Sequence, residues 1–172
     1  EAALHSILSH DLFVLYAKSG VGKTSLLKAR VANQLKDRDL WPVFIRMSDT
    51  RTPPTQLVRD ALRDEHGRNS LEVVGADESD PDLFELMTRI RIWKNDILQL
   101  PALVFDQFEE LFTLWDAHAA ERSAFIEQLA DVVRGVPAVG RSDASAAGTL
   151  VRPRVKVVLA LRPRLALAQT WV

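Results

Sequence analysis

A glycine-containing segment near the start of the chain carries the residue types that hold a polyphosphate. It reads Ala17-Lys18-Ser19-Gly20-Val21-Gly22-Lys23-Thr24-Ser25. Glycines let the backbone curl so that successive N–H groups point at phosphate oxygens. A lysine adds a full charge to the β- and γ-phosphates, and a threonine hydroxyl can ligate Mg²⁺. The segment predicts a phosphate-binding loop in which residues 19–25 contact a nucleotide, with Lys23 on the phosphates and Thr24 on the metal.

The flanking residues place this segment between a strand and a helix. The apolar run at 12–16 predicts a buried strand, and residues 25–36 predict a helix because Leu27, Val31 and Leu35 recur every fourth residue. The helix adds its partial positive N-terminus to the phosphate site. Ala17 stands where the strict pattern has glycine. The alternative is an ordinary strand-to-helix turn that contains glycine.

A second segment supplies a candidate metal ligand. Residues 102–106 form a short apolar run that ends in a carboxylate, Asp106. Such a run is typical of a strand buried on both faces of a parallel sheet, and ligands bind at the carboxyl ends of those strands. We therefore expect Asp106 to hold Mg²⁺, through water, opposite Thr24.

Two glutamates follow this carboxylate. The helical spacing of the apolar residues after Asp106 predicts a helix that starts just after it, with Glu109 and Glu110 in its first turn. One of them could polarise the attacking water as a general base. Alternatively, both complement the helix dipole.

An arginine ends the last predicted strand. Residues 155–161 are apolar except for Lys156, and Arg162 follows them. An arginine at this position could contact the γ-phosphate and report its presence. The alternative is a solvated arginine. The four histidines show no spacing typical of metal ligands.

Further elements complete the predicted fold. We expect a strand at 42–47, helices at 53–65 and 121–134, a surface loop at 66–80 and a loop at 135–151. Asp80 and Pro81 predict the start of another helix, with an apolar stripe that runs to Ile97. Strands that alternate with helices predict a three-layer α/β fold with a mainly parallel sheet.

Composition narrows the functional classes. The chain has 172 residues, a formal net charge of −1 and no cysteine. We expect one domain, no disulfides, no general attraction to nucleic acid and a cytoplasmic location. No apolar run approaches the roughly 20 residues that span a bilayer, and no secretory signal is recognisable. Because the first residue is Glu1, we expect a piece of a longer protein.

Three segments resemble the P-loop core of STAND-class NTPases, and the bacterial novel STAND group is the most similar. They are residues 15–27 with the Walker A pattern, residues 103–112 with the Walker B aspartate, and residues 157–162. The resemblance implies a P-loop NTPase domain over residues 1–172, with a three-layer αβα core of the ASCE type that lacks the C-terminal lid. It implies ATP or GTP and Mg²⁺ as ligands, metal binding by Thr24 and Asp106, and the sensor position for Arg162. It also implies a catalytic acidic residue, for which Glu110 is slightly favoured over Glu109.

The resemblance also implies a role. Such domains are nucleotide-dependent switches in signalling or defence proteins, partnered by effector and sensor domains of the same chain and by self-association on activation. We expect slow ATP hydrolysis and no membrane partner. Two other classes are a cycling ATPase motor on nucleic acid and a small-molecule kinase. The near-neutral charge and the lack of interleaved aromatic and basic residues argue against nucleic acid, and no acceptor pocket or basic lid for a kinase is identifiable.

Overall fold

The computed structural model describes residues 2–16, 27–76, 82–137 and 151–162. The predicted phosphate-binding loop, Ser19 to Ser25 with Lys23 and Thr24, lies outside the described residues.

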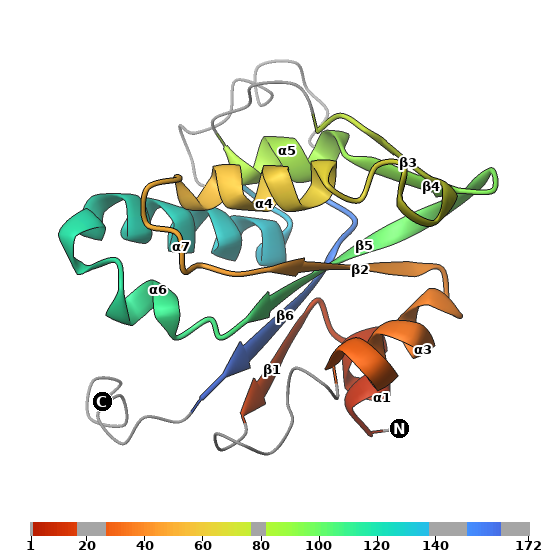
Figure 1. Cartoon of the computed structure of the whole chain (residues 1–172), viewed down its shortest axis with the longest axis horizontal. Helices are drawn as coiled ribbons and strands as arrows, with labels where there is room; N and C mark the ends of the chain where they lie inside the picture. Colours follow the sequence, from red (N-terminus) through yellow and green to blue (C-terminus); the bar gives the residue numbers. More distant parts are fainter. Residues whose placement is uncertain (1, 17–26, 77–81, 138–150, 163–172) are drawn as a thin grey trace.

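A parallel sheet forms the centre of the described fold (Figure 1). Its strands are, in spatial order, β1 (Leu12–Tyr16), β6 (Lys156–Leu161), β5 (Ile97–Asp106) and β2 (Leu40–Ile45). All three pairings between them are parallel. The first half of β5 continues into antiparallel pairing with β4 (Arg91–Lys94), which in turn pairs with β3 (Leu71–Val74). The predicted mainly parallel sheet is therefore present, with an antiparallel extension.

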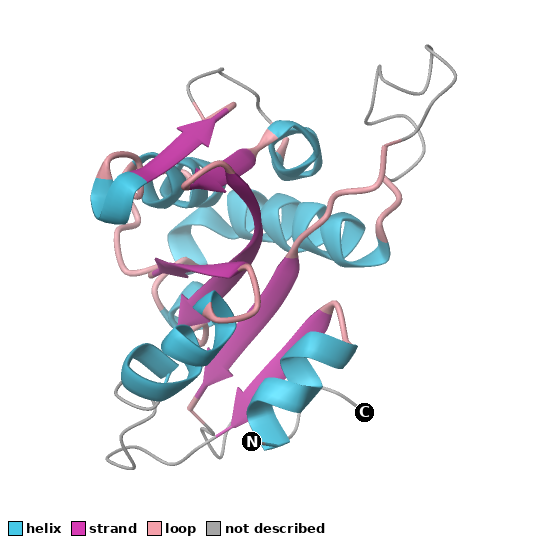
Figure 2. Ribbon diagram, turned by 90° about the vertical axis from the view of Figure 1, so that its right-hand side faces the viewer, coloured by secondary structure: helices cyan, strands magenta, loops and turns pink. Residues whose placement is uncertain are grey.

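Helices cover both faces of the sheet, as Figures 1 and 2 show. One face carries α1 (Ala2–Ser9) and α3 (Ala32–Lys36), and α3 continues from a π-helical stretch, Leu27–Val31. The other face carries α4 (Pro54–Arg63), α5 (Leu83–Arg89) and α7 (Ala119–Arg134). The molecule is thus a mixed α/β fold with a helix layer on each side of the sheet.

Alternation along β5 explains why both helix layers pack tightly. Leu103 and Phe105 belong to the core beneath α4, α5 and α7, whereas Ala102 and Val104 belong to the core beneath α1 and α3. Successive side chains of a strand point to opposite faces, so an apolar run feeds both cores. Each large apolar side chain buried in this way stabilises the fold by about 1.5–3 kcal/mol.

The predicted helix from residue 81 to Ile97 is wrong beyond its first two turns. α5 ends at Arg89, and a hairpin between β4 and β5 follows. Asn95 and Asp96 form its turn, with φ of 48° and 62°. Positive φ at both central positions is what a tight hairpin turn requires, and Asn and Asp tolerate it best among residues with a side chain. The apolar residues of 91–98 therefore belong to strands.

Two smaller expectations also need correction. The loop predicted at 66–80 contains β3, in which Leu71 and Val73 are buried while the residues after each are exposed. This alternation over four residues is typical of a strand, but the polar residues around it made the whole segment resemble a loop. The N-cap of α5 is Asp82, whose side chain accepts a 2.6 Å hydrogen bond from the Phe84 N–H. The predicted cap, Asp80, lies outside the described residues.

A tryptophan links the segments that follow β2 and β5. Trp115 is fully buried, and its indole N–H donates a 2.7 Å hydrogen bond to the carbonyl of Met47. We expect Trp115→Phe to reduce the free energy of unfolding by about 1–3 kcal/mol, because a buried carbonyl loses its donor. Urea unfolding measures this change. Trp93→Phe is the control: Trp93 is 36% exposed, and we expect a loss below about 0.5 kcal/mol. Equal losses in the two variants would contradict the role of the buried hydrogen bond.

Candidate functional site

The four parallel strands end together at one edge of the sheet. Tyr16 of β1 lies opposite Leu161 of β6, and Ala160 lies opposite Asp106 of β5. β2 ends one residue earlier, with Ile45 opposite Phe105. Because ligands of parallel α/β sheets bind beyond the carboxyl ends of the strands, this edge is the candidate site.

Asp106 is the central carboxylate of this edge. It is 4% exposed and continues the alternation that places Ala102 and Val104 in the core beneath α1 and α3. Its side chain therefore belongs to the sheet face covered by the helix that follows the glycine-containing segment. Thr24, the other predicted metal ligand, lies outside the described residues.

An arginine that the sequence analysis missed lies beside Asp106. Arg46 follows β2 directly, and its Nε is 3.9 Å from Oδ2 of Asp106. The register of β2 against β5 places residue 46 opposite residue 106. The sequence prediction placed Arg46 inside a strand at 42–47, whereas β2 ends at Ile45, so Arg46 follows the strand as Arg162 follows β6.

The chain leaves Asp106 through a tight turn, so the predicted helix starts later than expected. Gln107 has φ of 59°, and α6 (Glu110–Thr113) begins only at Glu110. The N–H of Phe108 donates a 3.0 Å hydrogen bond to the carbonyl of Ala160. A left-handed residue with a side chain costs about 1–2 kcal/mol, and this hydrogen bond with the burial of Phe108 offsets it.

Glu109 holds the predicted sensor arginine. Its side chain is buried, its Oε2 accepts a 3.1 Å hydrogen bond from the backbone N–H of Arg162, and its Oε1 lies 3.6 Å from Nε of Arg162. Both carboxylate oxygens are therefore engaged. The geometry makes Glu109 a positioning residue for Arg162.

Glu110 occupies a different environment although it is the next residue. Its Oε2 is buried and has no hydrogen-bond partner among the described residues. Burial raises the pKa of its carboxyl above the ordinary value, the charge of Arg46 opposes this shift, and the neighbouring Glu109 charge adds to it. A carboxylate with one buried oxygen that has no hydrogen-bond partner among the described residues is able to accept a proton from a bound water.

The structure thus brings four predicted site residues to one edge: Asp106, Glu109, Glu110 and Arg162. Within the described ranges, no cluster of three or more His, Cys, Asp or Glu side chains suits a metal ion. Mg²⁺ does not need such a cluster, because it is commonly held by one or two carboxylates together with substrate phosphates and waters. Asp106 fits that requirement.

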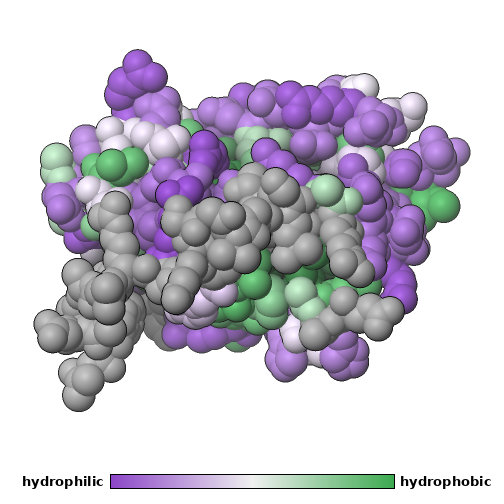
Figure 3. All heavy atoms as spheres, turned by 60° about the horizontal axis from the view of Figure 1, so that its bottom comes forward, coloured by the Kyte–Doolittle hydropathy of each residue, from purple (hydrophilic) through white to green (hydrophobic). Residues whose placement is uncertain are grey.

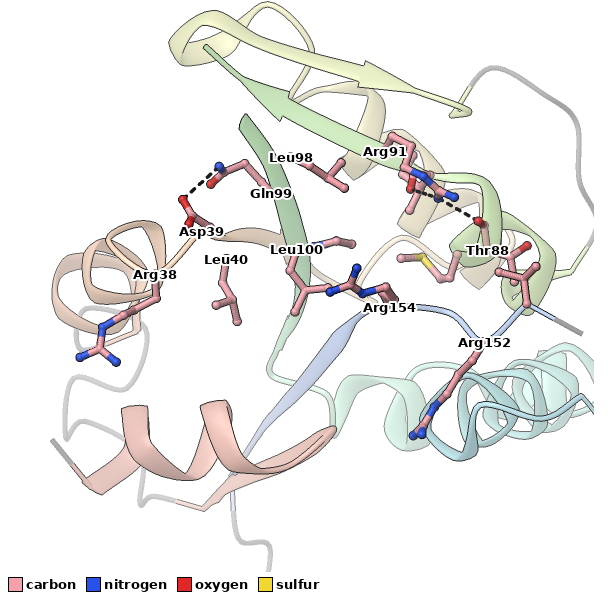
Figure 4. Close-up of a pocket in the computed structure, with 14 residues that line it drawn as sticks. Arg38, Asp39, Leu40, Thr88, Arg91, Leu98, Gln99, Leu100, Arg152 and Arg154 are labelled. Carbon is pink, nitrogen blue, oxygen red and sulfur yellow. Dashed lines mark hydrogen bonds between the residues drawn. The ribbon is translucent and has the colours of Figure 1, made fainter. Parts of the chain in front are cut away.

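A cleft of about 380 Å³ lies at the opposite edge, where the parallel strands begin (Figure 4). Its walls include four arginines, Arg38, Arg91, Arg152 and Arg154. Arg152 is paired with Asp11 at 2.7 Å, and Arg91 donates to backbone carbonyls of Thr88 and Ile90. None of the predicted site residues lines it.

The surface hydropathy and the helix lengths bear on whether the fold could sit in a membrane. Much of the described surface on the face shown in Figure 3 is hydrophilic. Among the residues that the structure describes, none of the helices has the length and apolar character needed to cross a bilayer.

A mixed α/β fold with helices on both faces, and with carboxylates and arginines gathered at the strand ends, is compatible with the αβα class of NTPases. The family model described as Novel STAND NTPase 1 matches residues 1–165. The chain belongs to this family, so it is a STAND-class NTPase of the novel group, and membership supports nucleotide binding. No curated protein and no solved structure matches the chain.

Proposed function

We propose that the chain is an ATP- and Mg²⁺-binding domain that hydrolyses ATP slowly and acts as a conformational switch in a longer signalling or defence protein. The observation that carries this proposal is the meeting of Asp106, Glu109, Glu110 and Arg162 at one sheet edge. β1 ends at the same edge with Tyr16, the residue before the glycine-containing segment. The order β1–β6–β5–β2, with β6 between the strands that precede the two motifs, supports a P-loop core of the ASCE type.

Each proposed role follows from chemistry at this edge. Lys23 and the backbone of residues 19–25 would hold the phosphates, and Thr24 and Asp106 would hold Mg²⁺. The metal would neutralise charge on the phosphate oxygens. Glu110 would accept a proton from the attacking water, since its carboxylate has a buried oxygen without a hydrogen-bond partner in the part of the chain that the structure describes.

The switch role rests on the connection between Glu109 and Arg162. The Glu109 carboxylate joins the turn after β5 to Arg162, the residue that follows β6. If the Arg162 guanidinium contacted a γ-phosphate, its ion pair with Glu109 would weaken or break. Binding and loss of the γ-phosphate would thereby change the bonding between two neighbouring strand ends, which is the kind of local change that effector and sensor domains can amplify.

Calorimetric titration with ATP and Mg²⁺, followed by a phosphate-release assay, tests the proposal. We expect saturable binding and hydrolysis well below about one turnover per second without added substrate. Strong stimulation by DNA would instead indicate a nucleic-acid motor, and phosphoryl transfer to a metabolite would indicate a kinase. Absence of nucleotide binding by the chain would overturn the proposal.

A further inference from the structure

Arg46 is a half-exposed cation at the candidate site that lies beside Asp106. Its Nε approaches Asp106 at 3.9 Å, which is too long for a hydrogen bond. Its charge also acts on the neighbouring Glu110, where it opposes the rise in the pKa of that carboxyl. The side chain is 54% exposed, so solvent or a ligand can reach it. A guanidinium offers five N–H donors in a fork that matches phosphate oxygens.

The backbone on both sides of Arg46 is fixed. Ile45 ends β2 and is 2% exposed, and Met47 is fully buried. The carbonyl of Met47 accepts the hydrogen bond from Trp115 described above. The backbone at Arg46 is therefore held by core packing on both sides, while the guanidinium lies beside Asp106 and is exposed enough for a ligand to reach it.

Arg46 and Arg162 flank Asp106 from opposite sides. Arg162 follows β6 and is engaged by Glu109, whereas Arg46 follows β2 on the other side of β5. Neighbouring strands lie about 4.8 Å apart, so Arg46 is about 5 Å from the strand of Asp106 but about 14 Å from β1. An arginine side chain at that distance reaches the space above Asp106 and not the start of the loop that follows β1.

We propose that Arg46 contacts the terminal phosphate of a bound nucleoside triphosphate and makes the site discriminate triphosphate from diphosphate. The inference rests on the proposed function, which places the α- and β-phosphates on the loop after β1 and the metal at Asp106. The terminal phosphate then lies over β5, within reach of Arg46. A purely local role, in which Arg46 only neutralises nearby carboxylates, would affect both nucleotides equally.

The test compares two nucleotides in three variants. Arg46→Gln, Arg46→Lys and the control Arg51→Gln are titrated calorimetrically with a non-hydrolysable imido analogue of ATP and with ADP, each with Mg²⁺. Arg51 lies in the same loop, is 89% exposed and pairs with Asp49 at 3.0 Å. We expect Arg46→Gln to weaken binding of the ATP analogue about 10- to 100-fold and ADP binding less than about 3-fold. Arg46→Lys should fall between wild type and Arg46→Gln because a lysine keeps the charge but loses the fork.

The control should bind both nucleotides as wild type does. Unchanged binding of the ATP analogue by Arg46→Gln, or equal weakening of both nucleotides, would overturn the inference and leave the proposed function intact. A wild-type chain that binds neither nucleotide would overturn the proposed function and the inference with it. Thermal unfolding of each variant shows whether the fold is retained, and Arg46→Lys answers the question if Arg46→Gln does not fold.

Discussion

Replacing Lys23 with alanine is expected to abolish ATP binding, with a rise in Kd of at least about 100-fold. Lys23 is the lysine that the motif places on the β- and γ-phosphates, where it supplies a full positive charge. Backbone N–H groups and a helix N-terminus carry only partial charges, so they do not replace it. Calorimetric titration with ATP and Mg²⁺ measures the loss.

The matched control is Lys28→Ala. Lys28 is exposed, and its ammonium lies 5.4 Å from the ring centroid of Phe44. The substitution therefore removes a lysine charge from the helical stretch Leu27–Val31 and leaves the predicted loop, residues 19–25, unchanged. We expect its Kd for ATP to stay within about 3-fold of wild type. An unchanged Kd in Lys23→Ala, or an equal loss in both variants, would show that the segment does not hold phosphate.

Much of the site could be predicted because strand ends are visible in the sequence. Asp106 and Arg162 each follow a short apolar run, and a buried parallel strand can end in a polar residue only at the edge where the chain leaves the core. The sheet then brings the two strand ends together, with Asp106 opposite Ala160. Which strand ends become neighbours depends on the order of the strands in the sheet. The residue pattern of a single strand does not contain that order.

The parts that could not be predicted depend on contacts between distant segments. Glu109 and Glu110 are adjacent and chemically identical. Yet Glu109 contacts Arg162, whereas Glu110 has a buried oxygen with no hydrogen-bond partner among the described residues. The left-handed Gln107 shifts the helix start to Glu110 and so separates their environments. The hairpin at 91–99 could not be predicted for a similar reason. Its apolar residues also fit the spacing of a helix, and the Asn95-Asp96 turn determines that they form two strands instead.

Glu110→Gln is expected to retain ATP binding and to lower turnover by about 10²–10³-fold. The amide keeps the size and the hydrogen-bonding shape of the side chain but cannot accept a proton from water. Phosphate release under saturating ATP measures turnover, and calorimetry measures binding. Glu109→Gln is the matched comparison: it weakens the contact with Arg162 and should have a smaller effect on turnover. If Glu109→Gln is the more damaging change, the base is Glu109; wild-type turnover in both variants would remove the role from this pair.

The same variant has a second readout, because the pKa of Glu110 is raised by burial from its ordinary value of 4.5. A raised pKa means that the charged carboxylate is disfavoured in the folded state, so ionisation destabilises the protein as the pH rises through the folded pKa. Glutamine carries no such charge. Glu110→Gln should therefore unfold at a higher temperature than wild type at pH 7–8, and the difference should shrink as the pH falls towards 4.5, where the carboxyl becomes protonated in both states. Thermal unfolding of both proteins across this range measures the difference. A difference that is independent of pH would show that the carboxylate is not held in the buried environment that suits a general base.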